Sequence, residues 1–178
     1  MIIIIIPSSI LTLLLLTITV DSTNLINQTC KISSMSDPNI NFDFCIDAFH
    51  KAPSSFDANL TRLGLISIIL VKHNVNDTII LAKTLLENFR GDNFTREGLE
   101  DCEELYEDSF LTLCQSARDY RGARFSDANI KVSSVIDASS TCEDGFGDFG
   151  VVSPLTKQNS DTFQLCAIAL SIIDMLMY

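Results

Sequence analysis

Apolar residues recur at steps of three and four along three stretches of the chain, residues 65–89, 99–120 and 128–146. This spacing places them on one face of an α-helix, which can be buried against a neighbouring helix. A fourth stretch, residues 163–177, is apolar on nearly every side and is predicted to be a central core helix. It is too short to span a membrane and contains Asp174. Strand-like alternation is absent, so we predict an all-α fold in which the four helices form an antiparallel bundle.

Residues between these stretches indicate where the helices end. Gly91 is suited to the left-handed conformation that follows many helices, and Thr95 can cap the start of the next helix. Residues 144–154 contain three glycines and Pro154, and we predict a loop there before the final helix. Because Gly91 has an adequate structural role, we do not interpret the Arg-Gly-Asp triplet at residues 90–92 as an integrin-binding motif.

The N-terminal residues are typical of a secretory signal peptide. Residues 2–6 and 11–20 are mostly apolar, and Val20 and Ser22 are small enough for the −3 and −1 positions of a signal-peptidase site. We therefore predict a signal peptide at residues 1–22 and a secreted protein. An uncleaved membrane anchor is the alternative.

The six cysteines are expected to form disulfides, because the predicted signal peptide directs the chain to an oxidising compartment. No Cys-x-x-Cys pair occurs, and no zinc-ligand spacing can be assembled with His50 or His73. Six cysteines allow fifteen pairings, so counting alone leaves the connectivity open.

Residues 23–56 are predicted to form a small unit that precedes the bundle of residues 57–178. They contain Cys30 and Cys45 with Pro38 between them, which suggests a helical hairpin closed by its own disulfide. The predicted fold is thus an antiparallel four-helix bundle with an N-terminal, disulfide-closed helical hairpin.

Four Asn-x-Thr sequons make a glycoprotein the expected product of a secreted chain. Their predicted N-glycosylation sites are Asn27, Asn59, Asn76 and Asn93. The formal net charge of −11 argues against a nucleic-acid partner and against binding to anionic membranes. We expect no membrane contact after the signal peptide is removed.

The motifs that would indicate an enzyme do not fit their requirements. Residues 145–150 spell G-x-G-x-x-G, but a dinucleotide site follows a strand, whereas here a helix precedes the motif and two aspartates flank it. The carboxylates of residues 100–108 circle a helix without converging, which indicates a solvated acidic face. Neither histidine lies near a nucleophile motif. We therefore predict a protein that binds another protein and has no catalytic residue, cofactor or metal.

Two cysteine motifs resemble those of a known family. They are Leu-Glu-Asp-Cys-Glu-Glu-Leu-Tyr-Glu-Asp at residues 99–108 and Ala-Ser-Ser-Thr-Cys-Glu-Asp-Gly-Phe at residues 138–146. Together they resemble the plant invertase and pectin methylesterase inhibitor family, and the resemblance covers essentially the whole mature chain. Residues 151–157, Val-Val-Ser-Pro-Leu-Thr-Lys, and the apolar final helix resemble most closely the invertase inhibitors of the pollen-allergen type.

This resemblance implies two disulfides, one within the hairpin and one between the second and third bundle helices: Cys30 with Cys45, and Cys102 with Cys142. In the family, a cysteine at the position of Cys166 is usually free. Cys114 departs from the family pattern. It leaves open whether Cys114 and Cys166 form a third bridge or remain two free thiols.

The resemblance also implies a protein partner, an invertase or a pectin methylesterase, for a monomer secreted to the cell wall or apoplast or sent to the vacuole. Invertase inhibitors insert a Pro-Lys-Phe turn between the second and third bundle helices into the sucrose site, which carboxylates line. Here Ala123, Arg124 and Phe125 occupy that turn. Arg124 keeps the charge and Phe125 keeps the ring, whereas Ala123 lacks the proline that would rigidify the turn.

Three alternatives remain for this turn and this chain. The turn can be a generic connection with no inhibitory role. The target can be a pectin methylesterase, in which case the bundle helices cover the pectin cleft and no single turn dominates. The protein can also be a secreted helical allergen that has retained no inhibition.

Overall fold

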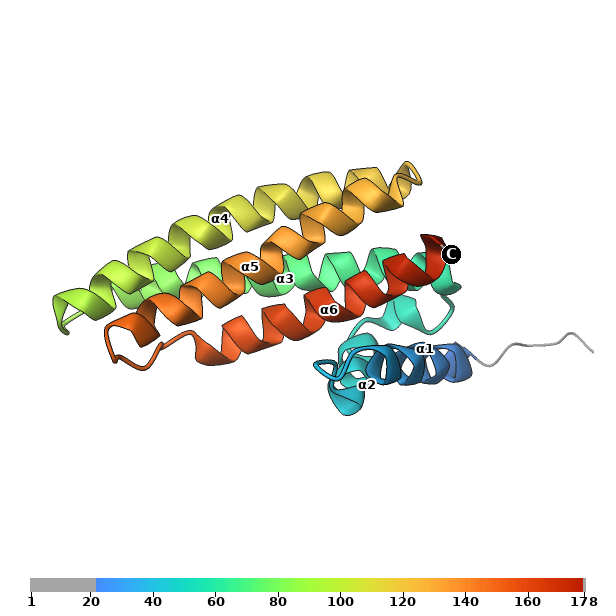
Figure 1. Ribbon diagram of the computed structural model, residues 1–178, viewed down its shortest axis with the longest axis horizontal. Coiled ribbons are helices and arrows are strands. Elements are labelled where there is room, and N and C mark those ends of the chain that lie inside the picture. Colours follow the sequence, from blue (N-terminus) through green and yellow to red (C-terminus); the bar gives the residue numbers. More distant parts are fainter. Residues whose placement is uncertain (1–21, 178) are drawn as a thin grey trace, which may run out of the picture.

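A computed structural model describes residues 22–177, and every regular element in this part of the chain is a helix (Figure 1). The predicted signal peptide, residues 1–22, lies outside the described residues except for Ser22. The elements, in chain order, are α1 (Ser22–Ser36), α2 (Phe42–His50), the short 3-10 helix η1 (Pro53–Ser55), α3 (Leu60–Glu87), α4 (Asn93–Arg121), α5 (Phe125–Asp148) and α6 (Thr156–Met177).

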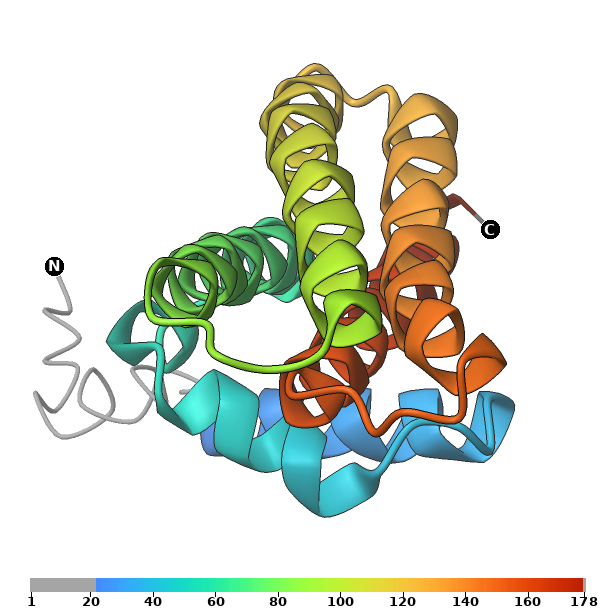
Figure 2. The same cartoon turned by 90° about the vertical axis from the view of Figure 1, so that its left-hand side faces the viewer.

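Helices α3 to α6 form the antiparallel bundle. Helix α4 packs against α3 and α5, and α6 packs against the same two helices from the other side (Figures 1 and 2). The core contains the apolar stripes that the sequence predicts, including Val71 on α3, Tyr106 on α4 and Val132 on α5. The predicted all-α bundle with an N-terminal hairpin is therefore confirmed.

The hairpin of α1 and α2 packs on the side of α6 that faces away from α4 (Figure 2). A second apolar cluster fills this contact, with Ile26 and Phe49 from the hairpin packed against Ile168 and Ile172. The Gln164 side chain accepts a hydrogen bond from the Asn41 backbone N–H at 2.9 Å and donates another to the Asn39 carbonyl. Helix α6 is thus buried from two directions.

Two disulfides join neighbouring helices, and they are the two pairs that the family resemblance implies. Cys30–Cys45 joins α1 to α2, and Cys102–Cys142 joins α4 to α5. The thiols of Cys114 and Cys166 are free, half-buried on α4 and buried on α6 respectively. Burial in apolar surroundings raises the pKa of the Cys166 thiol and keeps it in its neutral form.

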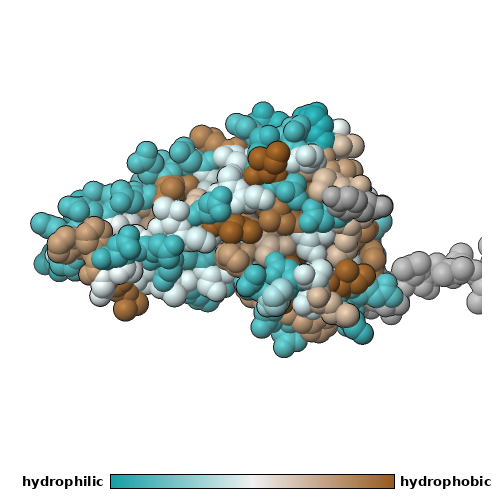
Figure 3. Space-filling view, viewed as in Figure 1, coloured by the Kyte–Doolittle hydropathy of each residue, from teal (hydrophilic) through white to brown (hydrophobic). Residues whose placement is uncertain are grey.

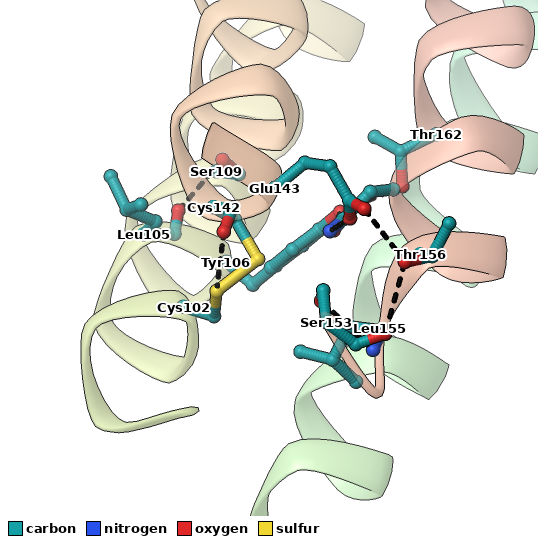
Figure 4. Close-up of a disulfide and its surroundings, with 11 residues drawn as sticks. Cys102, Leu105, Tyr106, Ser109, Cys142, Glu143, Ser153, Leu155, Thr156 and Thr162 are labelled. Carbon is teal, nitrogen blue, oxygen red and sulfur yellow. Dashed lines mark hydrogen bonds between the residues drawn. A yellow bond between two sulfur atoms is a disulfide. The ribbon is translucent and has the colours of Figure 1, made fainter. Parts of the chain in front are cut away.

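A chain of polar side chains crosses the core beside the Cys102–Cys142 bridge (Figure 4). The Tyr106 hydroxyl donates to Asn159 Oδ1 at 2.6 Å, and Asn159 Nδ2 donates to Glu143 Oε2 at 2.6 Å. Asn74 donates to Thr162 Oγ1 at 2.7 Å, and this oxygen lies 3.3 Å from the Tyr106 hydroxyl. Because a buried polar group without a partner is costly, this network holds all four bundle helices in one register.

Several helix ends differ from the sequence-based prediction. Helix α3 ends at Glu87, and Gly91 does not adopt a left-handed conformation. Asp92, not Thr95, is the N-cap of α4: its carboxylate accepts hydrogen bonds from the Thr95 backbone N–H and hydroxyl, both at 2.8 Å. A carboxylate at the N-terminus is also favoured by the helix dipole, which is why it takes the capping position.

The predicted loop at residues 144–154 is wrong over its first half, because α5 continues to Asp148. Phe146 is buried, and its ring lies over Gly98 of α4, so burial of this ring stabilises a final turn that glycines would otherwise weaken. The left-handed residue is Gly150, with φ of 68°, just after the helix end.

The final helix is also longer than predicted. With 22 residues, α6 is long and apolar enough to cross a membrane, as is α3, so the expectation that it is too short was wrong. Both helices bury a face against the rest of the bundle, and the core helices of soluble proteins share this length and composition.

Two glycine substitutions test how closely the helices pack. A Cβ added at Gly64 on α3 would lie 2.8 Å from Cζ of the buried Tyr120 ring, whose hydroxyl is held by the Thr61 carbonyl at 2.8 Å. We expect Gly64→Ala to lower the free energy of unfolding by about 1–3 kcal/mol through overpacking.

Gly145→Ala is the matched control, because a Cβ there has no neighbour within 4 Å. It should raise the free energy of unfolding by up to about 1 kcal/mol through helix propensity. Urea denaturation of both variants measures the difference. Equal effects would show that α3 and α4 are not in close contact at Gly64.

Candidate partner-binding site

The turn between α4 and α5 lies at the end of the bundle opposite the α3–α4 and α5–α6 connections (Figure 1). It is short because N–H groups of the turn form hydrogen bonds with backbone carbonyls in the last turn of α4. The Ala123 N–H donates to the Tyr120 carbonyl at 3.0 Å, and the Arg124 N–H donates to the Asp119 carbonyl at 2.9 Å. These bonds place Ala123, Arg124 and Phe125 side by side at the surface.

Ala123 has a left-handed backbone conformation, with φ of 56°. A non-glycine residue in this region costs roughly 1–2 kcal/mol. Proline cannot adopt it, because its ring holds φ near −65°. The expectation that Ala123 stands where a rigidifying proline would fit is therefore wrong for this turn, and its rigidity comes from the hydrogen bonds of the turn.

Arg124 is exposed but already has a partner. Its Nη2 and Nε lie 2.5 Å and 3.1 Å from Asp119 Oδ1, and its side chain remains 56% exposed. Asp119 also pairs with Lys131 Nζ, 2.7 Å from its other oxygen. Hydrogen bonds from Lys131 and then from Arg124 lower the pKa of Asp119 below its ordinary value. Asp119 thus fixes the direction of the Arg124 side chain, a role that the sequence pattern does not indicate.

Phe125 is half-buried and packs edge-on against Tyr120, with ring centroids 5.1 Å apart. Burial raises the pKa of Tyr120, whose hydroxyl donates to the Thr61 carbonyl on α3. The ring therefore has a structural role as well as an exposed edge. That edge lines a hollow shared with Arg62 and Arg121, two cations that no motif in the sequence indicates as functional.

A second hollow lies between the bundle and the hairpin, where apolar residues gather on the visible face (Figure 3). Ile32 of α1, Ile136 of α5 and Phe163 of α6 are among the residues that line it. The helical stripes place these residues on different elements, so only the packing of the hairpin on α6 brings them together.

The four predicted glycosylation sites all lie on exposed positions of the described residues: Asn27, Asn59, Asn76 and Asn93. Asn59 is also the N-cap of α3, where its Oδ1 accepts a hydrogen bond from the Arg62 N–H at 2.9 Å. Its amide nitrogen, the atom that carries an N-linked glycan, is not used in this cap. Glycosylation of these sites stays a prediction.

Within residues 22–177, no group of three or more His, Cys, Asp or Glu side chains could hold a metal ion. His50 stacks on Phe56, with ring centroids 5.6 Å apart, and His73 is exposed on α3. What the surface offers is a charged turn and shallow hollows, features suited to contact with another protein.

The fold and the turn thus define a disulfide-bridged helical protein whose exposed features suit recognition of a partner protein. Residues 24–172 match the family described as plant invertase/pectin methylesterase inhibitor. The chain belongs to this family, whose members are inhibitors and not catalysts.

Relatives and solved structures agree with this membership. The chain is 37% and 35% identical to two proteins named "Putative invertase inhibitor", from Platanus acerifolia and Platanus orientalis; the matches cover 92% and 87% of this chain and 92% and 91% of those proteins. A mutant pectin methylesterase inhibitor from Arabidopsis has a similar fold, with a TM-score of 0.68 and 23% identity over 82% of this chain and 96% of that chain.

Substitutions at Ala123 test the conformation of the turn. Ala123→Gly should raise the free energy of unfolding by about 1 kcal/mol, because glycine adopts positive φ without steric cost. Ala123→Pro should lower it, because proline cannot adopt φ of 56° and removes the N–H that bonds to Tyr120. Thermal and urea denaturation provide the measurement. A proline variant as stable as the glycine variant would contradict the left-handed turn.

The pH dependence of stability tests Asp119. Because its pKa is lowered in the folded state, its ion pairs stabilise the fold above the unfolded pKa of about 3.9, and this contribution is lost as the pH falls through the lower folded value. Asp119→Asn should therefore be less stable than the wild type at pH 6, and the difference should shrink as the pH falls below the unfolded pKa toward the lowered folded pKa.

Asp127→Asn is the matched control, because this exposed carboxylate lies 3.7 Å from Arg124 Nε and an exposed pair contributes little. Urea midpoints measured from pH 3 to pH 7 give the comparison. An effect of Asp119→Asn that does not change with pH would contradict the ion-pair role.

Proposed function

We propose that this protein is a secreted, monomeric inhibitor of an invertase, in the cell wall or, alternatively, in the vacuole. In this proposal Ala123, Arg124 and Phe125 enter the sucrose site of the enzyme. The observation that carries the proposal is an exposed guanidinium beside an aromatic ring, on a short turn at the end of the bundle, in a chain whose relatives carry the name of invertase inhibitors.

The chemistry of the turn suits a site lined by carboxylates. Asp119 uses one N–H each of Nε and Nη2, so the remaining donors of the guanidinium are free to bind a carboxylate of the target. Because Asp119 already orders the side chain, less rotamer entropy is lost when the target binds. The exposed edge of Phe125 then adds apolar contact next to the charge.

Pectin methylesterase is the alternative target. Its support is a 31% identical match over 80 residues to "Pectinesterase inhibitor 12" of Arabidopsis thaliana, which covers 45% of this chain. In this alternative the bundle helices cover the pectin cleft. Titration of the purified protein against an invertase and against a pectin methylesterase separates the two targets, and inhibition of neither supports a helical allergen without inhibitory function.

Substitution of Arg124 tests the proposed contact. Arg124→Ala should raise the inhibition constant against a susceptible invertase by roughly tenfold or more, as for a central charged residue of an interface. Arg96→Ala is the matched control, because Arg96 is also exposed and also pairs with a carboxylate nearby in the sequence, Glu100, at the other end of α4. The control should leave the inhibition constant unchanged. An unchanged constant for Arg124→Ala would exclude the inhibitory role of this residue.

A further inference from the structure

Charge is segregated along the first two bundle helices. The N-terminal half of α4 contains the acidic run of residues 97–108, whereas residues 109–121 contain a single carboxylate, Asp119. Residues 60–76 of α3 contain no carboxylate at all. Because the helices are antiparallel, the acid-poor halves meet at the end of the bundle that carries the Ala123–Phe125 turn.

Four cations lie on these acid-poor halves, and we call them the basic strip: Arg62 and Lys72 on α3, and Arg118 and Arg121 on α4. The three arginines are exposed and Lys72 is half-buried, with its Nζ 5.7 Å from the centre of the Phe110 ring. None of the four forms an ion pair with a carboxylate of residues 22–177, in contrast to Arg124, Lys83 and Lys131.

The strip is continuous with the turn. One hollow is lined by Arg62, Arg121 and the turn residues Ala123 and Phe125. The next hollow along the groove between α3 and α4 is lined by Lys72, Arg118 and again Arg121. From Arg62 to Lys72 the strip extends about 15 Å along α3, at 1.5 Å per residue. It offers several cations where the turn alone offers one.

We propose that the basic strip is an electrostatic docking surface for acidic residues around the active site of the target enzyme. The inference rests on the proposed inhibitory function. It assigns to Arg62 and Arg121 the binding of target carboxylates that Arg124 alone cannot bind. Arg124 must share its guanidinium with Asp119, whereas the strip cations gain a carboxylate without giving up an internal one. Phe125 lines one hollow with Arg124 and another with Arg62 and Arg121, so its ring provides apolar contact next to both.

The segregation of charge also orients the encounter. The protein is acidic overall, with a formal net charge of −11, so an acidic partner would be repelled by most of its surface. The strip presents positive charge along α3 and α4, and the acidic half of α4 lies toward the opposite end of the bundle. Complementary fields of this kind mainly raise the association rate and suppress wrong orientations.

Charge reversal tests the strip. The variant Arg62→Glu with Arg121→Glu should raise the inhibition constant of the full secreted chain by at least tenfold and slow association with the enzyme. Its matched control is Arg90→Glu with Lys157→Glu, which changes the net charge equally at exposed residues of the opposite end of the bundle. The control should stay within about twofold of the wild type, and equal effects of the two variants would overturn the proposal.

The same experiment distinguishes failure of the inference from failure of the proposed function. A wild-type protein that inhibits neither invertase nor pectin methylesterase overturns the proposed function and the docking surface with it. A wild-type protein that inhibits, with an unaffected strip variant, overturns the docking surface alone. Binding of the wild type to polygalacturonate, lost in the strip variant while inhibition is retained, would assign the strip to an acidic polysaccharide and also overturn the proposal.

Cys114 provides a readout that requires no substitution, because it lines the hollow of Lys72, Arg118 and Arg121. Alkylation of this half-buried thiol by iodoacetamide should slow at least fivefold when the target enzyme is bound. The buried thiol of Cys166 is the internal reference and should react slowly in both states. An unchanged rate at Cys114 in the saturated complex would show that the strip lies outside the interface.

Discussion

Helix α6 occupies the middle of the molecule, and the rest of the structure is arranged around its burial. One side contributes Ala169 and Ile173 to the bundle core, and the other contributes Ile168 and Ile172 to the contact with the hairpin. A helix with apolar residues on two sides is stable only when both of these sides are covered. The hairpin therefore buries the second apolar side of α6, and the Cys30–Cys45 disulfide joins the two helices of the hairpin.

Apolar burial alone would allow the bundle helices to slide or rotate, and polar groups restrict this freedom. The network from Asn74 through Tyr106 and Asn159 to Glu143 is satisfied only when four helices have one alignment. The Cys102–Cys142 bridge lies beside it and fixes α4 to α5. These two helices carry the turn, so the core constraint also determines where Arg124 and Phe125 are presented.

The exposed end of the bundle carries one cation that is paired with a carboxylate, Arg124, next to cations that form no ion pair with the described residues. Asp119 forms ion pairs with Arg124 and Lys131. The pair with Arg124 orders the turn, but it occupies part of the guanidinium's hydrogen-bond donors. Arg62 and Arg121 have no such partner among the described residues. In the proposed function, the turn provides the shape that enters the enzyme, and the basic strip provides the positive charge that attracts an acidic partner.

The sequence by itself determined the helical class, the four stripes and the core residues on them, because a period of three to four apolar positions specifies both helix and buried face. It also determined the family, through motifs around Cys102 and Cys142. Local signals were less reliable at helix ends, where burial of Phe146 outweighed the glycines around it. Only the structure decided the left-handed Ala123 and the Asp119 partner of Arg124, because the conformation of a short turn has no apolar period that a sequence pattern could show. Only the tertiary structure brought Arg62 next to Arg121, because contacts between residues far apart in the chain leave no trace in local periodicity.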